Sequence, residues 1–174
     1  MSRLILTSMS LAVTALAVVT TATMPSCVIY NPSSSAPEGW YAIEPANQLQ
    51  VGEHVLVHLP AAAAALAAQR GYLPSGIPLV KRIAARAPQH VCAQADVVLI
   101  DGRLAAHLLS ADAQGRLLLA WRGCRRLVAG ELFLMSETSA ASYDSRYFGP
   151  VMRERVIGRA RALWTWAPDG SGGH

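Results

Sequence analysis

The N-terminal segment limits what this chain can fold into more than any other feature, because residues 4–30 carry no charged side chain. About 20 apolar residues suffice to cross a bilayer as a helix, and the segment from Leu4 to about Met24 has that length. Arg3 stands immediately before it, which predicts a cytoplasmic N-terminus and an external remainder. We therefore expect a cytoplasmic tip and a transmembrane anchor over residues 1–30.

A cleaved signal peptide is the competing interpretation of this segment, because its charged n-region is short and small residues follow at positions 21–23. Cleavage there would leave Ser35, a candidate nucleophile, on a short free N-terminal tail, and for that reason we favour a retained anchor. The rest of the chain has the length of one domain over residues 31–168, followed by a polar, glycine-rich tail over residues 169–174.

The net charge of +4 comes largely from arginine. Neither a nucleic-acid-binding motif nor an aromatic-rich basic platform accompanies these residues in the sequence. We interpret them as solvated charges on strands and loops, and we expect no nucleic-acid partner.

Three cysteines limit the metal and redox chemistry. If the domain lies outside the cytoplasmic membrane, Cys92 and Cys124 can form a disulfide, which leaves Cys27 unpaired at the membrane edge. The three cysteines lack the paired spacing of a zinc site, so we expect no metal.

Apolar runs separated by glycine and proline predict a mostly β domain. The expected strands cover residues 39–43, 53–59, 77–85, 115–121, 131–135 and 156–166. Asp101-Gly102 predicts a hairpin within residues 97–104, and the alanine run between Pro60 and Arg70 predicts a short helix. These elements indicate a coiled or partly closed β-sheet with one or two short helices.

Two local features are compatible with a serine hydrolase that uses a lysine base. A serine hydroxyl is a weak nucleophile until a base takes its proton, and lysine can act as that base only when its amine is neutral. Lys81 lies among Leu79, Val80 and Ile83, so we expect a buried strand and a pKa lowered by desolvation. Taken alone, Lys81 is more typical of a solvated edge residue, and the run Ser33–Ser35 is more typical of a linker.

The order of three segments is more specific than any one of them. A serine segment follows the N-terminal span, the lysine strand Leu79–Ile83 comes next, and the box Ser142–Gly149 with the pattern Ser-x-Asp-Ser-Arg comes last. This order resembles the signal peptidase I clan, whose members carry a membrane anchor, a nucleophilic serine beyond it, a strand lysine and a later box of that kind. The resemblance extends from the anchor to about Gly158.

Within this clan, the chain is most similar to the TraF-type conjugative-transfer serine peptidases. The similarity is carried by the segments Ser35–Tyr41, Arg70–Pro74, Trp121–Cys124 with Cys92, and Gly130–Leu134. Two departures separate the chain from general signal peptidases. Ser136–Ser139 stands where those carry Gly-Asp-Asn-Arg, and Ala36-Pro37 replaces a longer, Met-containing segment. Both departures favour the transfer branch.

The resemblance implies a Ser–Lys dyad. Ser35 would be the nucleophile and Lys81 the general base, although spacing alone leaves the adjacent Ser34 open. The backbone N–H of Ser35 and the hydroxyl of Ser33 would form the oxyanion hole.

The same resemblance implies supporting roles in the later box. Ser142 would orient the amine of Lys81, and Asp144 and Arg146 would form an ion pair behind the site. For Asp144 we favour structural support over an influence on catalysis.

The resemblance therefore implies a membrane-anchored serine endopeptidase on the periplasmic face of the bacterial cytoplasmic membrane. Its expected partner is a membrane-proximal protein precursor, above all conjugative pilin, which it would cleave and could also cyclise. No metal or organic cofactor is needed for that chemistry. The alternatives are a general signal peptidase that removes secretory leaders and, from another class, a non-catalytic assembly subunit of a secretion or pilus apparatus.

Overall fold

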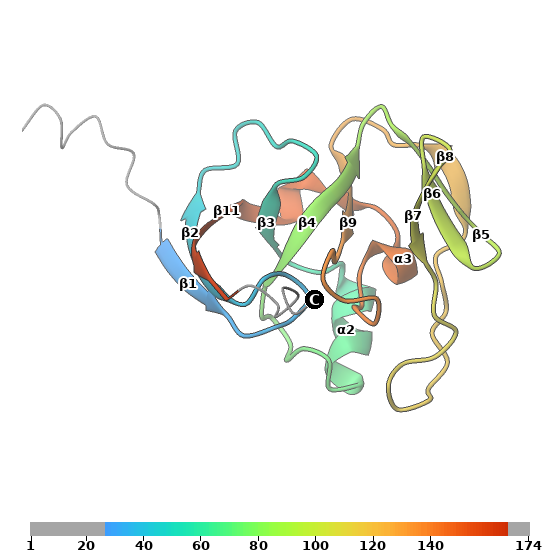
Figure 1. Ribbon diagram of the computed structural model, residues 1–174, viewed down its shortest axis with the longest axis horizontal. Coiled ribbons are helices and arrows are strands. Elements are labelled where there is room, and N and C mark those ends of the chain that lie inside the picture. Colours follow the sequence, from blue (N-terminus) through green and yellow to red (C-terminus); the bar gives the residue numbers. More distant parts are fainter. Residues whose placement is uncertain (1–26, 167–174) are drawn as a thin grey trace, which may run out of the picture.

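The computed structural model describes residues 27–166, which form a mostly β domain with two antiparallel sheets and short helices (Figure 1). The predicted span from Leu4 to Met24 and the predicted tail over residues 169–174 lie outside the described residues. Within residues 27–166, no helix combines the length and the apolar character needed to cross a membrane.

The larger sheet has seven strands in the order β1-β2-β11-β3-β4-β9-β10. Its strands are β1 (Cys27–Asn31), β2 (Gly39–Glu44), β3 (His54–Val57), β4 (Leu79–Arg86), β9 (Glu131–Met135), β10 (Val151–Met152) and β11 (Val156–Thr165). The last strand, β11, pairs with both β2 and β3, so it joins the N-terminal strand pair to the rest of the sheet. Five of the predicted strands are confirmed here, with ends shifted by a few residues.

The smaller sheet has four strands in the order β7-β6-β5-β8. Its strands are β5 (His90–Gln94), β6 (Val97–Ile100), β7 (Arg103–His107) and β8 (Gly123–Arg126). Asp101 and Gly102 both have positive φ, 49° and 78°, which is the backbone of the predicted two-residue hairpin turn. Cys92 lies directly opposite Cys124 in the pairing of β5 with β8, and the two form the disulfide.

Two sequence-based predictions need correction, the end of the anchor and one strand. The sheet begins at Cys27, so residues 27–30, which we had placed in the anchor, pair with β2 as part of β1. Cys27 is exposed and unpaired within that strand. The strand predicted over residues 115–121 is wrong, because this segment is a loop whose one bridge joins Ala111 to Leu117.

Within residues 27–166, three short helices accompany the sheets: α2 (Ala61–Gln69), α3 (Ser145–Phe148) and a 3₁₀ turn (Arg153–Arg155). Helix α2 follows Pro60 as predicted, and it buries Ala63 and Ala67 in a cluster with Leu59, which lies between β3 and the helix. Helix α3 was not predicted. It begins where the side chain of Asp144 accepts a hydrogen bond from the backbone N–H of Arg146.

Strand β4 is buried on both faces, and this places its lysine in an apolar environment. Val80 packs on one side in a cluster with Ala36, Tyr41 and Leu56. Ile83 packs on the other side against residues of β3 and β9. At the start of β2, a Cβ on Gly39 would lie 2.1 Å from the carbonyl oxygen of Trp164, so only glycine permits this close approach of β11.

Candidate active site

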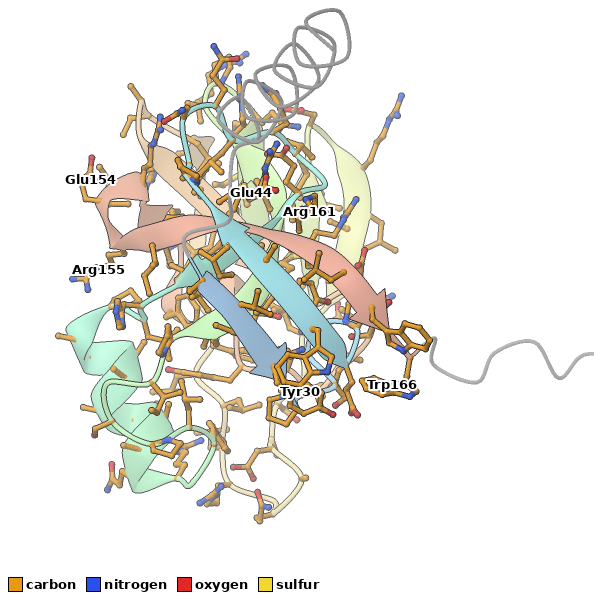
Figure 2. All side chains as sticks on the ribbon, turned by 90° about the vertical axis from the view of Figure 1, so that its left-hand side faces the viewer. Tyr30, Glu44, Glu154, Arg155, Arg161 and Trp166 are labelled. Carbon is orange, nitrogen blue, oxygen red and sulfur yellow. A yellow bond between two sulfur atoms is a disulfide. The ribbon has the colours of Figure 1, made fainter. Side chains whose placement is uncertain are left out.

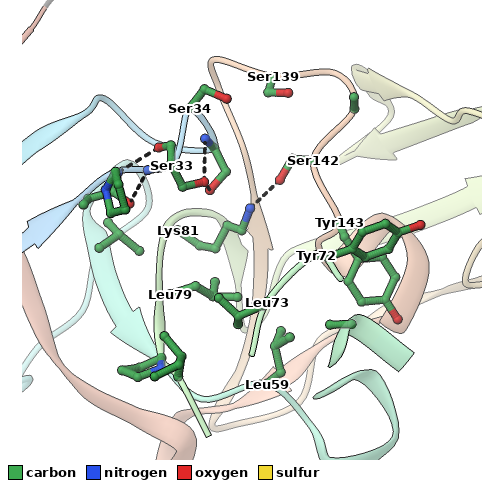
Figure 3. Close-up of a pocket in the computed structure, with 18 of the residues that line it drawn as sticks. Ser33, Ser34, Leu59, Tyr72, Leu73, Leu79, Lys81, Ser139, Ser142 and Tyr143 are labelled. Carbon is green, nitrogen blue, oxygen red and sulfur yellow. Dashed lines mark hydrogen bonds between the residues drawn. The ribbon is translucent and has the colours of Figure 1, made fainter. Parts of the chain in front are cut away.

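A cleft of about 500 Å³ brings together three segments that are far apart in the sequence (Figure 3). The loop between β1 and β2 contributes Ser33–Ser35, β4 contributes Lys81, and the loop before α3 contributes Ser142. Leucine and tyrosine side chains near α2 are among the other residues that line it. All the sequence-predicted candidates for nucleophile, base and orienting group therefore line one cavity.

Lys81 is almost completely buried, with 2% of its surface exposed. Burial lowers the pKa of its amine from 10.5 to about 8. The carboxylate of Asp144 partly opposes this change, and the guanidinium of Arg146 adds to it. The Nζ atom donates a hydrogen bond to Oγ of Ser142, so the predicted orienting contact is present.

The serine loop holds Ser35 at the mouth of the cleft beside the hydroxyl of Ser33. Oγ of Ser33 donates to Oγ of Ser35 at 3.0 Å, and the backbone N–H of Ser35 donates to Oγ of Ser33 at 3.3 Å. The two predicted oxyanion donors thus lie together at the candidate nucleophile. The hydrogen bond of Lys81 goes to Ser142 and not to Ser35.

Ser34 differs from its neighbour. In Figure 3 its hydroxyl points away from Lys81. Its backbone carbonyl accepts a hydrogen bond from Oγ1 of Thr138, which joins the serine loop to the loop after β9. This geometry favours Ser35 over Ser34 as the candidate nucleophile.

Asn31 is a buried residue of the candidate site that the sequence analysis missed. Its side chain is buried, and Nδ2 donates to the carbonyls of Ser33, Ala36 and Pro37 at 2.9–3.2 Å. Its Oδ1 accepts from the backbone N–H of Ser33. One amide therefore satisfies the backbone on both sides of Ser35 and fixes the turn.

Asp144 and Arg146 form the predicted ion pair at 2.8 Å, with side chains 0% and 3% exposed. The guanidinium also donates to the carbonyls of Ser139 and Ser142. The carboxylate accepts from the backbone N–H of Ser136 at 3.0 Å. The pair therefore holds both ends of the loop that carries Ser142.

Comparison with known proteins agrees with this arrangement. The family model described as "Signal peptidase, peptidase S26" matches residues 1–166. The chain belongs to the peptidase S26 family.

The relatives within the S26 family confirm the resemblance to the TraF branch. Conjugal transfer protein TraF of Agrobacterium fabrum is 38% identical over 148 residues, which cover 79% of this chain and 82% of that protein. Plasmid transfer protein TraF of Escherichia coli is 35% identical over 109 residues, which cover 58% of this chain and 62% of that protein. A crystal structure of a signal peptidase I from Enterococcus faecalis V583 matches with a TM-score of 0.39 and 16% identity, over 65% of this chain and 97% of that chain.

In this S26 chain, Ser136–Ser139 forms a contact of its own with the strands below. Glu137 lies 3.1 Å from Nε2 of His54 on β3 and 3.1 Å from Nε of Arg82 on β4. Burial lowers the pKa of His54, as does the charge of Arg82, while Glu137 opposes both. The segment Ser136–Ser139 therefore ties the serine loop, through Thr138, to the strand of the lysine.

Proposed function

We propose that this S26 protein is a membrane-anchored serine endopeptidase with Ser35 as nucleophile and Lys81 as general base. The observation that carries the proposal is the buried amine of Lys81, held by Ser142 in the same cleft as Ser33 and Ser35. A buried amine with a lowered pKa is neutral often enough near neutral pH to accept a proton. A scaffold protein gains nothing from a lysine that is costly to bury.

Each residue of the site then has a defined role in the reaction. Oγ of Ser35 attacks the peptide carbonyl while its proton passes to Nζ of Lys81, whose orientation Ser142 fixes. The N–H of Ser35 and the hydroxyl of Ser33 turn to the developing oxyanion. The ammonium of Lys81 returns the proton to the leaving amine, which leaves an acyl-enzyme on Ser35. Water then releases a shortened product, or the amino terminus of the substrate attacks and closes a ring.

We further propose that the substrate is a conjugative pilin precursor close to the membrane. The two relatives named as transfer proteins support a role in conjugative transfer. The uncharged segment from Leu4 to Met24 supports a membrane anchor. The disulfide supports a periplasmic location, since such bonds persist in oxidising compartments.

An exposed aromatic cluster also supports a location at the membrane surface. Tyr30 lies with its ring centroid 5.3 Å from that of Trp40 and 6.0 Å from that of Trp166. Figure 2 shows Tyr30 and Trp166 side by side at the edge of the larger sheet, and all three rings are about half exposed. Tyrosine and tryptophan are the residues that favour membrane–water interfaces.

The pH dependence of processing follows from the state of Lys81. Only the neutral amine accepts the serine proton, so we expect the rate to rise with pH and to reach half its maximum near pH 8. Lys81 is the only lysine of the chain, and ¹³C labelling of lysine therefore gives a single side-chain signal. We expect this signal to titrate with the same midpoint. A midpoint near about 10.4, the value of a solvated lysine, would contradict the role of Lys81 as base.

Coexpression with two substrates tests the proposed function against its alternatives. The enzyme is expressed with a conjugative pilin precursor or with a secretory protein that carries a cleavable leader, and product masses are measured. We expect a shortened pilin, and a pilin lighter than the shortened linear form by one water if the ring closes. Cleavage of the secretory protein alone favours a general signal peptidase, and unchanged masses of both favour a scaffold subunit.

A further inference from the structure

The loop between β7 and β8 forms one wall of the cleft, next to the end of α2. Figure 1 shows this yellow segment extending to the level of α2, far from the sheet that bears its two ends. Asp112, Ala113, Gln114 and Leu118 of the loop line the same cleft as Lys81. The loop is therefore in a position to touch a bound substrate chain.

Four polar residues fasten this loop to the end of α2, and we name them the clasp: Arg70, Tyr72, Asp112 and Arg116. The hydroxyl of Tyr72 donates to Oδ2 of Asp112, and Nε of Arg116 donates to the same oxygen at 2.7 Å. Arg116 also donates to the carbonyl of Arg70 at 3.1 Å, and Arg70 donates to the carbonyl of Leu117 at 2.9 Å.

Charge and burial make Asp112 the centre of the clasp. Its side chain is 7% exposed. Burial raises the pKa of this carboxyl, but hydrogen bonds from Tyr72 and Arg116 outweigh that effect and hold the pKa below its usual range. The clasp therefore contains an ionised carboxylate throughout the pH range in which the enzyme would work.

Apolar packing fixes the two ends of this loop, where Leu108 and Trp121 pack against the core cluster that contains Phe133, but it contributes little at the tip. Leu117 and Leu119 are 63% and 77% exposed, so their side chains remain largely in solvent. Leu118 between them is buried, but it lines the cleft itself. At the tip of the loop, the polar contacts of the clasp therefore determine the position of this wall.

The clasp also adjoins the candidate catalytic residues. The ring of Tyr72 lies 5.5 Å from that of Tyr143, and Tyr143 follows Ser142 in the chain. Figure 3 shows Tyr72 and Tyr143 together on the side of the cleft beyond Ser142. A substrate chain that reaches Ser35 through this cleft passes between the clasp and β4.

We propose that the clasp sets the position of the cleft wall against which the substrate chain lies, so that Tyr72 and Asp112 are positioning residues for substrate binding. The inference rests on the proposed peptidase function. Because the clasp touches neither Ser35 nor Lys81, its loss is felt in the binding of substrate and not in the chemical step.

Steady-state kinetics of the full-length enzyme on purified pilin precursor test the inference. Tyr72→Phe removes one hydroxyl, and Asp112→Asn removes the charge while keeping the shape of the side chain. We expect each variant to raise KM by about tenfold while kcat stays within about twofold, because only uniform binding is lost. The pH midpoint of kcat stays at its wild-type value.

Arg125→Gln is the matched control, since Arg125 on β8 forms an ion pair at 2.7 Å with Glu131 on β9, away from the cleft lining. Its KM is expected to be unchanged. An unchanged KM in both clasp variants, or a fall in kcat with a shifted pH midpoint, would overturn the inference while the peptidase stands. Wild-type enzyme that leaves the precursor intact would overturn the proposed function itself, and the inference with it.

Discussion

Replacing Lys81 by Met is expected to lower the rate of precursor processing by about 10²–10⁴-fold, because the general base is lost. The same replacement is expected to stabilise the fold at pH 7. Methionine fills a similar volume without a charge to desolvate, whereas burial of Lys81 lowers its pKa from 10.5 to about 8. That shift corresponds to a cost of about 3 kcal/mol, from which the lost hydrogen bond to Ser142 subtracts about 1 kcal/mol.

The lowered pKa of Lys81 also predicts how the stability difference between Lys81→Met and wild type changes with pH. Between pH 8 and 10.5 the unfolded chain holds the lysine proton and the folded protein releases it, so the wild-type free energy of unfolding rises with pH. Below pH 8 the cost is present in full. Urea unfolding at pH 7 and pH 10 is therefore expected to show an advantage of Lys81→Met that shrinks as the pH rises. If the stability difference between Lys81→Met and wild type is the same at both pH values, the amine of Lys81 is solvated.

Breaking the buried ion pair is expected to have the largest effect on stability. Removing one partner leaves the other charge buried and unpaired, which costs about 3–5 kcal/mol. We therefore expect Asp144→Ala and Arg146→Met each to lower the free energy of unfolding by that amount in urea titrations. The loop that carries Ser142 loses its supports at the same time.

The exposed pair of Arg161 with Glu44 provides the control for this prediction. Arg161 is 53% exposed, and an exposed pair contributes about 0–1 kcal/mol. Arg161→Met is thus expected to unfold much as the wild type does and to keep its activity. Asp144→Asn separates the two roles considered for Asp144. Wild-type stability with lost activity would assign it to catalysis and not to support.

The strands that bear the site could be predicted because their burial is regular. Leu79, Val80 and Ile83 flank Lys81, and β4 indeed buries both faces. The segment over residues 115–121 is equally apolar. In the structure, however, the side chain of Trp121 packs against Gly123 and Gly149, and the backbone N–H of Trp121 donates to the carbonyl of Arg146. The contacts with Arg146 and Gly149 join residues distant in sequence, so no local pattern reveals that the segment is a loop.

The edge strand β1 was missed for a related reason. Val-Ile-Tyr at positions 28–30 suits an apolar helix end and a strand equally well. Only its pairing with β2 decides between them. Strand β8, with the sequence Gly-Cys-Arg-Arg, carries too few apolar residues to give a strand signal, and the disulfide to Cys92 helps to place it.

The candidate site could be predicted as a set of residues but not as a network. Motifs predict the roles of Ser35, Lys81 and Ser142. A further indication of the base is that Lys81 is the only lysine among the 15 lysine and arginine residues. Arginine cannot act as a base because it stays protonated. The contacts of Asn31 escaped prediction, because Asn-Pro-Ser is typical of any turn.

The central claim is that Ser35, and not a neighbouring serine, is the nucleophile that processes the precursor. The direct measurement is the intact mass of the pilin precursor from cells that express wild type, Ser34→Ala or Ser35→Ala. Both variants lose one hydroxyl from the same exposed loop, so they differ only in which serine remains. The account predicts processed pilin with wild type and Ser34→Ala, and unprocessed precursor with Ser35→Ala. Processed pilin with Ser35→Ala would contradict it.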